Sequence, residues 1–280
     1  MYTLNCRGKI LTIERPLVMG ILNATPDSFF TGSRINKKEN LFERVEKMIS
    51  EGVDIIDVGG QSTRPGAEKI TEEEELERVI DVISQIHTGF PELIISVDSF
   101  YSKVVREAVG AGASMVNDVS AGSVDDNMLD TVASLGVPYV LMHMRGTPRN
   151  MQDHTHYDDL LKELLDHFIQ KLAVCRKSGI RDIIIDPGFG FAKTTQQNFE
   201  LMKNLNLFFM LDCPILLGLS RKGMIYKTLG VSADDALNGT TVMNTMGLMN
   251  GASILRVHDV REAAQAVKLF MAYAAGDGPK

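Results

Sequence analysis

Eight short apolar runs constrain the fold of this chain more than any other feature. Each run is rich in β-branched residues and is bounded by turn-forming residues, as buried strands are. Runs that are continuously apolar, rather than alternating, are typical of parallel strands covered on both faces. The runs begin at residues 17, 53, 93, 114, 138, 182, 214 and 253, and read LVMGILN, VDIIDVG, LIISVDS, SMVNDV, PYVLMHM, DIIIDPG, PILLGLS and SILRVHD.

Helical patterns separate most of these runs. Residues 37–52 and 157–179 repeat apolar residues at helical spacing, and each segment ends at a glycine. A third segment starts with Thr71 and Glu74, a capping-box pattern followed by a solvated acidic helix start. Parallel strands need such crossover connections. The pattern therefore predicts an α/β protein with a single (β/α)₈ TIM barrel, preceded by a short N-terminal β-hairpin at the barrel floor. A doubly wound open sheet is the alternative.

Length and composition agree with one globular unit. The chain has 280 residues, 44% hydrophobic and 23% charged, which is ordinary globular composition. We expect one domain over residues 1–280, because no linker or low-complexity tract interrupts the pattern. A net charge of −7 argues against nucleic acid or a membrane surface as a partner, since binders of either carry broad basic patches. A local cationic pocket for an anionic small molecule stays compatible with it.

The cysteines and the N-terminus indicate a cellular compartment. Cys6, Cys175 and Cys213 are far apart and odd in number, so we expect reduced, buried thiols rather than a disulfide framework or a zinc site. The first residues lack the apolar core of a signal peptide, and no stretch approaches the roughly 18 apolar residues of a membrane span. We therefore expect a cytoplasmic protein.

Polar residues close almost every predicted strand, at the end where TIM barrels place their active sites. A turn or a helix cap would explain any one of them, but caps do not use arginine or histidine. Only one of two neighbouring residues can face the barrel axis. The strand-end residues are Asn23, Asp57, Asp98, Asn117 with Asp118, His143, Asp186, Ser220, and Arg256 with His258.

Arg256 and His258 stand two positions apart in the last run, so a strand would point both side chains to the same side. Both donate hydrogen bonds and no acid lies between them, which predicts an anion site. A surface ion pair with Asp259 or Glu262 is the alternative. The rich loops NATPDSFFTGSR, GGQSTRPGA and GLSRKGM add glycines and donors at the same mouth. Together they suit an NH-rich heterocycle that carries phosphates.

The order of the motifs resembles the dihydropteroate synthase family. MGILNATPDSF, DIIDVGGQSTRPGA, SVDS, VNDVS, LMHMRGTPRNMQ, IIIDPGFGF, GLSRKGMI and RVHDV follow one another as in that family, from about Leu17 to Val260. The resemblance implies a (β/α)₈ barrel, usually a homodimer, that acts in folate biosynthesis with Mg²⁺ and is the target of sulfonamides. It implies condensation of 4-aminobenzoate with (7,8-dihydropterin-6-yl)methyl diphosphate, giving 7,8-dihydropteroate and pyrophosphate.

The resemblance also implies roles for individual residues. It places the pterin ring among Asp98, Asn117, Asp186 and Lys222. It places the diphosphate at Asn23, Thr63, Arg64, Arg256 and His258, with the metal near Asn23. It frames the aminobenzoate with Phe29, Pro65, Lys222 and Ser220. The residues expected to take part in catalysis are Asn23, Asp27, Arg64, Lys222, Arg256 and His258.

Two positions depart from the family pattern: Thr31 stands where an acid is common, and Gln61 stands where glutamate is common. A methyltetrahydrofolate-binding methyltransferase is the rival within the fold, but it has no diphosphate to hold. A catalytically silent pterin-binding paralogue is the rival from another class. We interpret His154 and His156 as a polar loop rather than a metal pair, and His143 as a packing residue.

Overall fold

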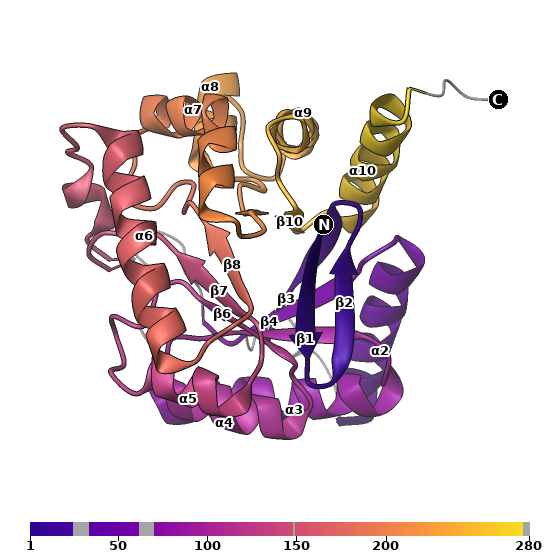
Figure 1. The fold of residues 1–280 in the computed structure, drawn as a ribbon. Coiled ribbons are helices and arrows are strands. Elements are labelled where there is room, and N and C mark those ends of the chain that lie inside the picture. Colours follow the sequence, from indigo (N-terminus) through magenta and orange to yellow (C-terminus); the bar gives the residue numbers. More distant parts are fainter. Residues whose placement is uncertain (25–33, 62–69, 148, 277–280) are drawn as a thin grey trace.

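The computed structural model describes residues 1–24, 34–61, 70–147 and 149–276, with only the backbone for residues 34–39. Its main sheet has eight strands in the order β8-β7-β6-β5-β4-β3-β10-β9, and all described pairings within it are parallel. The predicted barrel is confirmed (Figure 1). The strands are β3 (Leu17–Asn23), β4 (Ile55–Gly59), β5 (Ile94–Asp98), β6 (Met115–Asp118), β7 (Tyr139–Met142), β8 (Ile183–Asp186), β9 (Leu216–Leu217) and β10 (Ile254–Val257).

The barrel closes between β8 and β9, where the pairing is least extensive. A single bridge joins Ile185 to Ile215, and the Ile185 amide donates to the Pro214 carbonyl at 3.0 Å. The seventh predicted run is therefore a strand of only two residues, shorter than the sequence suggests. Pro214 at its start has no N–H to donate to a ladder, which limits the pairing on that side.

Helices surround the strands and bury the apolar outer face of the sheet (Figure 1). The α-helices are α2 (Arg34–Ser50), α3 (Glu72–Gly89), α4 (Ser102–Ala111), α5 (Met128–Leu135), α6 (Leu160–Ser178), α7 (Thr195–Lys203), α8 (Gly223–Leu229), α9 (Leu237–Met249) and α10 (Val260–Ala274). Two 3₁₀ helices, η1 (Met151–His154) and η2 (Leu205–Leu211), lie in the connections. None of the helices in the described ranges is both long and apolar enough to cross a membrane.

The predicted helix boundaries follow from local capping. The Thr71 hydroxyl accepts from the Glu74 amide at 3.2 Å, and the Glu74 carboxylate accepts from the Thr71 amide at 2.9 Å, so the capping box of α3 is confirmed. Helix α6 ends at Gly179, whose φ of 101° is a left-handed conformation that glycine adopts without strain. The start of α3 and the end of α6 thus lie where local groups satisfy the free ends of the helix.

An N-terminal hairpin closes the floor of the barrel. Strands β1 (Tyr2–Cys6) and β2 (Lys9–Ile13) pair antiparallel, as predicted. Leu4, Cys6 and Ile13 are buried in one cluster with inward-facing residues near the strand starts: Leu17, Met19, Ile55, Ile94, Met115, Val140, Ile184, Leu216 and Ile254. Arg15 then ties the hairpin exit to Asp54 through bonds of 2.6 and 3.1 Å. The floor is therefore a plug of apolar side chains, with the Arg15–Asp54 ion pair at its edge.

The three cysteines are buried and free, as the sequence predicts. Burial raises the pKa of the Cys6 thiol to about 12 and that of Cys175 to about 11. Thiols with pKa values this high carry little thiolate at neutral pH, so a structural role follows for both.

We expect the plug to contribute to stability through burial. Leu4 is 2% exposed inside the floor cluster, whereas Ile10, on the same hairpin, is 66% exposed. Leu4→Ala should lower the free energy of unfolding by about 2–4 kcal/mol, because it leaves a cavity under the barrel. Ile10→Ala is the matched control and should change it by less than about 0.5 kcal/mol. Equilibrium unfolding in guanidinium chloride measures both, and equal losses would contradict a plug.

Candidate active site at the carboxyl ends of the strands

The side chain of Arg256 joins three strands at the centre of the barrel mouth. From β10 it donates through Nε to Asp57 Oδ2 of β4 at 2.6 Å, and through a terminal nitrogen to Asp98 Oδ2 of β5 at 2.5 Å. Asn117 of β6 donates to the same Asp57 oxygen at 3.0 Å. The guanidinium, two carboxylates and an amide thus form one buried cluster, and each of the four side chains comes from a different strand.

Two carboxylates around one cation leave this group short of positive charge. Burial raises the pKa of Asp98 to about 7, while Arg256 lowers it and Asp57 raises it further. Burial opposes the charge of Arg256, but Asp57 and Asp98 raise its pKa above its ordinary value. Arg256 is therefore permanently charged, and the surrounding oxygens can accept N–H groups from a ligand.

This geometry corrects one expectation from the sequence. The partners of Arg256 are Asp57 of β4 and Asp98 of β5, neither of which lies near it along the chain. Asp259 is not its partner either, because Asp259 pairs with Arg221 at 2.8 and 2.9 Å. The alternative of an Arg256–Asp259 surface pair is therefore wrong, and the acids that bind Arg256 come from other strands.

The neighbours Asn117 and Asp118 point to opposite sides, as strand alternation requires. Asn117 faces the barrel interior and Asp57. Asp118 accepts from the Tyr139 hydroxyl at 2.7 Å, and from the amides of Ser120 and Gly122 at 2.7 and 2.8 Å. Asp118 is therefore a structural acceptor behind the strand, and only Asn117 belongs to the mouth.

A second carboxylate and a lysine stand on the other side of the mouth. Asp186 ends β8 and accepts from the Gly188 amide at 2.8 Å. Lys222, after β9, donates to the Phe189 carbonyl at 2.6 Å, and its Nζ lies 4.4 Å from the Phe191 ring centroid. Burial lowers the pKa of Lys222 to about 8 and raises that of Asp186, and the attraction between the two opposes both shifts. A carboxylate and a cationic donor are thus presented together.

His258 lies at the rim, separate from the buried part of Arg256. Its side chain is exposed, and its Nδ1 lies 3.1 Å from Ser220 Oγ. The His258 amide also donates to Ser220 Oγ at 3.2 Å, so the two strand-end segments are joined. The histidine and the arginine therefore offer donors at two depths rather than at one point.

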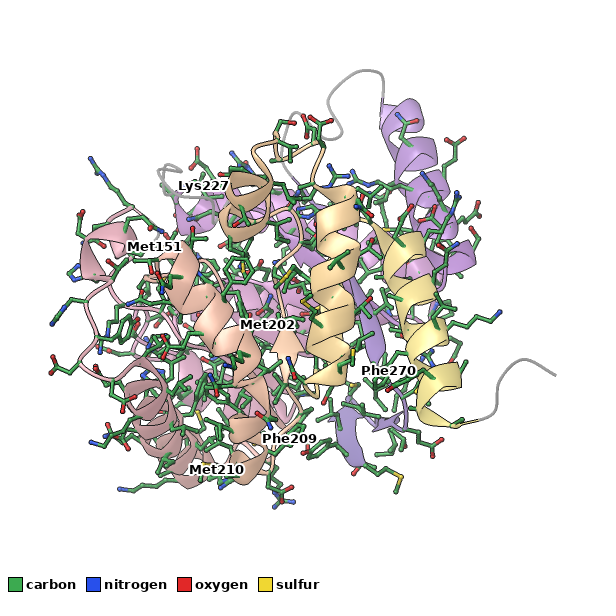
Figure 2. The ribbon with its side chains drawn as sticks, turned by 90° about the horizontal axis from the view of Figure 1, so that it is seen from above. Met151, Met202, Phe209, Met210, Lys227 and Phe270 are labelled. Atoms are coloured by element: carbon green, nitrogen blue, oxygen red, sulfur yellow. The ribbon has the colours of Figure 1, made fainter. Side chains whose placement is uncertain are left out.

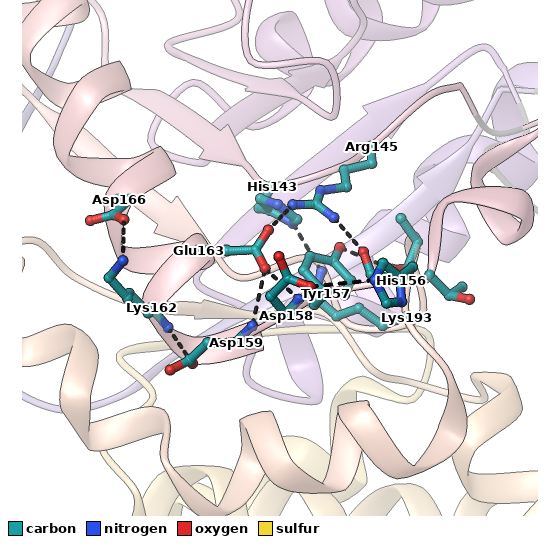
Figure 3. Close-up of polar contacts among 12 residues, drawn as sticks. His143, Arg145, His156, Tyr157, Asp158, Asp159, Lys162, Glu163, Asp166 and Lys193 are labelled. Atoms are coloured by element: carbon teal, nitrogen blue, oxygen red, sulfur yellow. Dashed lines mark hydrogen bonds and ion pairs between the residues drawn. The ribbon is translucent and has the colours of Figure 1, made fainter.

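Lys193 is a buried residue of this region that sequence reasoning missed. It is 3% exposed, and its Nζ lies 3.0 Å from His143 Nδ1 (Figure 3). Burial lowers the pKa of Lys193 to about 7 and that of His143 well below its ordinary value, so the imidazole is neutral. His143 also packs against His167 and Phe168, in agreement with the predicted packing role.

Glu75 was also missed, because it sits in an acidic run interpreted as solvated. It is 1% exposed; its Oε2 accepts from Ser99 Oγ at 2.9 Å, and its Oε1 has no partner among the described residues. Burial raises its pKa to about 7, and nearby Asp98 adds to the rise. Helical spacing could have found it, since Glu75, Val79 and Ile83 fall on one face of α3.

The remaining candidates divide into described and undescribed residues. Asn23 ends β3, partly buried beside Gly59 of β4. Within the described ranges no cluster of three or more His, Cys, Asp or Glu could hold a metal ion. The loop candidates lie outside the described residues: Asp27, Phe29, Thr31, Thr63, Arg64 and Pro65.

Comparisons with known proteins agree on one family. A model described as pterin binding enzyme matches residues 19–258. Dihydropteroate synthase of Escherichia coli K12 is 41% identical over 268 residues, covering 95% of this chain and 94% of the relative. That of Haemophilus influenzae is 39% identical over 273 residues, covering 97% and 98%.

Solved structures show the same likeness. The Yersinia pestis dihydropteroate synthase with a sulfonamide drug complex superimposes with a TM-score of 0.91 at 37% identity, over 98% of this chain and 100% of that one. The Xanthomonas albilineans synthase with 4-aminobenzoic acid gives a TM-score of 0.89 at 40% identity, over 99% of each chain.

The buried Glu75 carboxyl should make stability depend on pH. Its pKa in the folded state exceeds that of the unfolded chain, so the folded state binds the extra proton between about pH 4.5 and 7 and loses stability as pH rises through that window. The side chain in Glu75→Gln never ionises. Between pH 5 and pH 8 the free energy of unfolding of this variant should therefore rise by roughly 1–3 kcal/mol relative to that of the wild type. Urea unfolding at several pH values measures this.

The exposed Glu77 of the same helix provides the control. Glu77→Gln should show no pH-dependent difference from the wild type. A Glu75→Gln difference that stays constant from pH 5 to pH 8 would contradict a proton on Glu75.

Proposed function

As a member of the pterin-binding enzyme family with dihydropteroate synthase activity, this chain condenses 4-aminobenzoate with (7,8-dihydropterin-6-yl)methyl diphosphate, and we propose how its residues divide that reaction. The observation that carries the proposal is the mouth of the barrel, where Arg256 links Asp57 and Asp98 opposite the Asp186–Lys222 pair. Acceptors and cationic donors thus occupy one site, as a flat NH-rich ring with an anionic tail requires.

The acceptor-rich part suits the pterin. A carboxylate accepts two N–H bonds from an aminopyrimidine edge, and Asp186, oriented by the Gly188 amide, is placed to do so. Asp98 offers a second acceptor. Asn117 and Lys222 donate to ring nitrogen or carbonyl positions. Asp57 binds no ligand in this scheme; it orients Arg256 and Asn117.

The donor-rich part suits the diphosphate. The two bonds of Arg256 to carboxylates use two of the five N–H donors of a guanidinium, so further donors can face an anion. His258 adds a donor at the rim, and Thr63 and Arg64 are proposed to complete the set. These donors stabilise the charge that develops on the departing pyrophosphate. The amine of 4-aminobenzoate attacks the methylene carbon, and no covalent bond to the enzyme is needed.

Mg²⁺ fits the residues available to hold it. The amide oxygen of Asn23 is the hard donor that Mg²⁺ prefers, and Mg²⁺ commonly takes its other ligands from substrate phosphates and water. Bound there with the diphosphate, the ion would neutralise charge on the leaving group.

The aminobenzoate is proposed to lie between Phe29, Pro65, Ser220 and Lys222. Asp27 and Arg64 are proposed to act from the two loops beside it. Sulfonamides that mimic the aminobenzoate would occupy the same place. We also propose that residues 1–280 act as one domain and that the protein is cytoplasmic, where the free state of its three cysteines is usual.

A homodimer is proposed from a stripe of exposed apolar side chains. Val242, Met246 and Met249 follow one another at helical spacing on α9, and Met249 is 62% exposed. Exposed Phe209 and Met210 of η2, labelled in Figure 2, extend the stripe. The Phe209 ring packs beside Gly251, just after the end of α9. A contiguous apolar surface of this kind favours association with a second copy.

Because Arg256 and His258 lie at different depths, mutating each of them should weaken ligand binding to a different extent. His258→Ala should weaken binding of the pterin diphosphate by about 1–2 kcal/mol and leave 6-hydroxymethyl-dihydropterin unaffected, because it removes only a rim donor. Arg256→Ala should cost about 2–4 kcal/mol for the diphosphate and also weaken the bare pterin, because Asp57 and Asp98 lose their cation. Calorimetric titration with each ligand, with and without Mg²⁺, measures this.

Mg²⁺ should strengthen binding of the diphosphate ligand only. Equal losses of both ligands in His258→Ala would contradict the assignment of the rim. Pyrophosphate release on mixing both substrates with the wild type excludes the methyltransferase alternative, and rescue of folate synthesis in a synthase-deleted cell excludes the silent paralogue.

The dimer stripe predicts the effect of charge on association. Met246→Glu combined with Met249→Glu should shift the sedimentation coefficient from that of a dimer to that of a monomer, because two charges would be buried. Ile169→Glu is the control, since Ile169 is exposed on α6, outside the stripe. A dimer that survives the double change, or a wild type that is monomeric at micromolar concentration, would overturn the proposed interface.

A further inference from the structure

A buried ammonium group lies behind the pterin side of the site and has no role in the proposed chemistry. The Lys193 Nζ contacts three acceptors: His143 Nδ1 at 3.0 Å, the Gly188 carbonyl at 3.0 Å and the Phe191 carbonyl at 3.1 Å. An ammonium has three N–H donors, so each donor has one acceptor. A buried lysine whose donors all have acceptors indicates a group with a structural target rather than a solvated side chain.

The target is the turn of residues 187–193, which follows β8. Gly188 (φ 71°), Gly190 (φ 81°) and Ala192 (φ 49°) all lie in the left-handed region, so the turn is tight. A Cβ on Gly188 would lie 2.0 Å from the His143 carbonyl oxygen, which shows how closely the turn packs onto the end of β7. Lys193 closes this turn by binding the carbonyls of two of its residues.

The same turn holds the two residues assigned to the pterin. Its Gly188 amide donates to Asp186, and its Phe189 carbonyl accepts from Lys222. The Phe191 ring, on the residue whose carbonyl Lys193 binds, lies under the Lys222 ammonium at 4.4 Å. Lys193 thus binds the carbonyls of Gly188 and Phe191, the two residues that contact Asp186 and Lys222.

The connection between β7 and α6 covers the turn from outside. The Tyr157 hydroxyl donates to the Ala192 carbonyl at 3.0 Å, and Gln152 donates to the Gly190 carbonyl at 3.3 Å. Arg145 stacks on the Tyr157 ring at 3.9 Å and pairs with Glu163 (Figure 3). Lys193 is therefore sealed between two connections, out of reach of a substrate.

We infer that Lys193 is a positioning residue: its ammonium fixes the 187–193 turn against His143 and thereby sets the Asp186 carboxylate and the Lys222 ammonium for the pterin, an inference that rests on the proposed function. Electrostatics support it, because the charge of Lys193 helps to keep the buried Asp186 ionised. The other titratable groups that face this region are His143, His167, Arg145, Tyr157 and Lys222. His143 is neutral and can accept from the ammonium.

Lys193→Met keeps the length of the stem and removes all three donors. We expect the dissociation constant of 6-hydroxymethyl-dihydropterin and the KM for the pterin diphosphate to rise at least about tenfold. Lys171→Met is the matched control, since Lys171 binds the Ala121 carbonyl of a different turn at 2.9 Å. It should leave pterin binding unchanged.

A double-mutant cycle with Asp186→Asn separates this inference from the proposed function. If Lys193 acts through Asp186, Lys193→Met should add little to the loss in the Asp186→Asn background. Unchanged pterin binding in a folded Lys193→Met, or losses that simply add, would overturn the positioning role. Unchanged pterin binding in Asp186→Asn would overturn the proposed pterin site instead. Lys193→Gln, which keeps an amide donor, should show an intermediate loss and replaces Lys193→Met if that variant does not fold.

Discussion

The structure depends on one cation held between two carboxylates. Arg256 reaches from β10 to Asp57 and Asp98 on strands at another part of the barrel, and Asn117 completes the group. Burying any of these charges alone would be costly, and removing one partner would leave the others uncompensated. The four strands β10, β4, β5 and β6 must therefore keep their register if the group is to form, so the interaction that shapes the binding mouth also requires the correct order of these strands.

The barrel interior is divided by depth. The strand starts and the hairpin fill the lower part with apolar side chains, whereas carboxylates, amides and cations occupy the upper part. A polar cluster of this kind contributes little net stability, because desolvation offsets much of the attraction. The apolar floor and the shell of helices supply the burial that allows the mouth to keep charges suited to ligand binding.

Sequence patterns predicted the architecture because they are local. The strand runs and the capping box at Thr71 follow from spacing along a few residues. Strand alternation likewise predicted that only one of Asn117 and Asp118 faces the barrel axis. The partners of Arg256 could not be predicted in this way, because Asp57 lies 199 positions away and comes close only once β10 pairs with β3. Glu75 and Lys193 were hidden for a related reason: an acidic run and a lysine after a glycine-rich turn look solvated until tertiary packing covers them.

The thin seam between β8 and β9 has a consequence for dynamics. Elsewhere the described strands share ladders of bonds, but here a single bridge joins Ile185 to Ile215. Asp186 follows the bridge residue of β8, and Lys222 follows β9. A ligand that contacts both side chains would therefore hold the two strands together at the barrel mouth. Without ligand, we expect β8 and β9 to separate transiently more often than the other strand pairs. Slower amide exchange in these two strands would then indicate an occupied site.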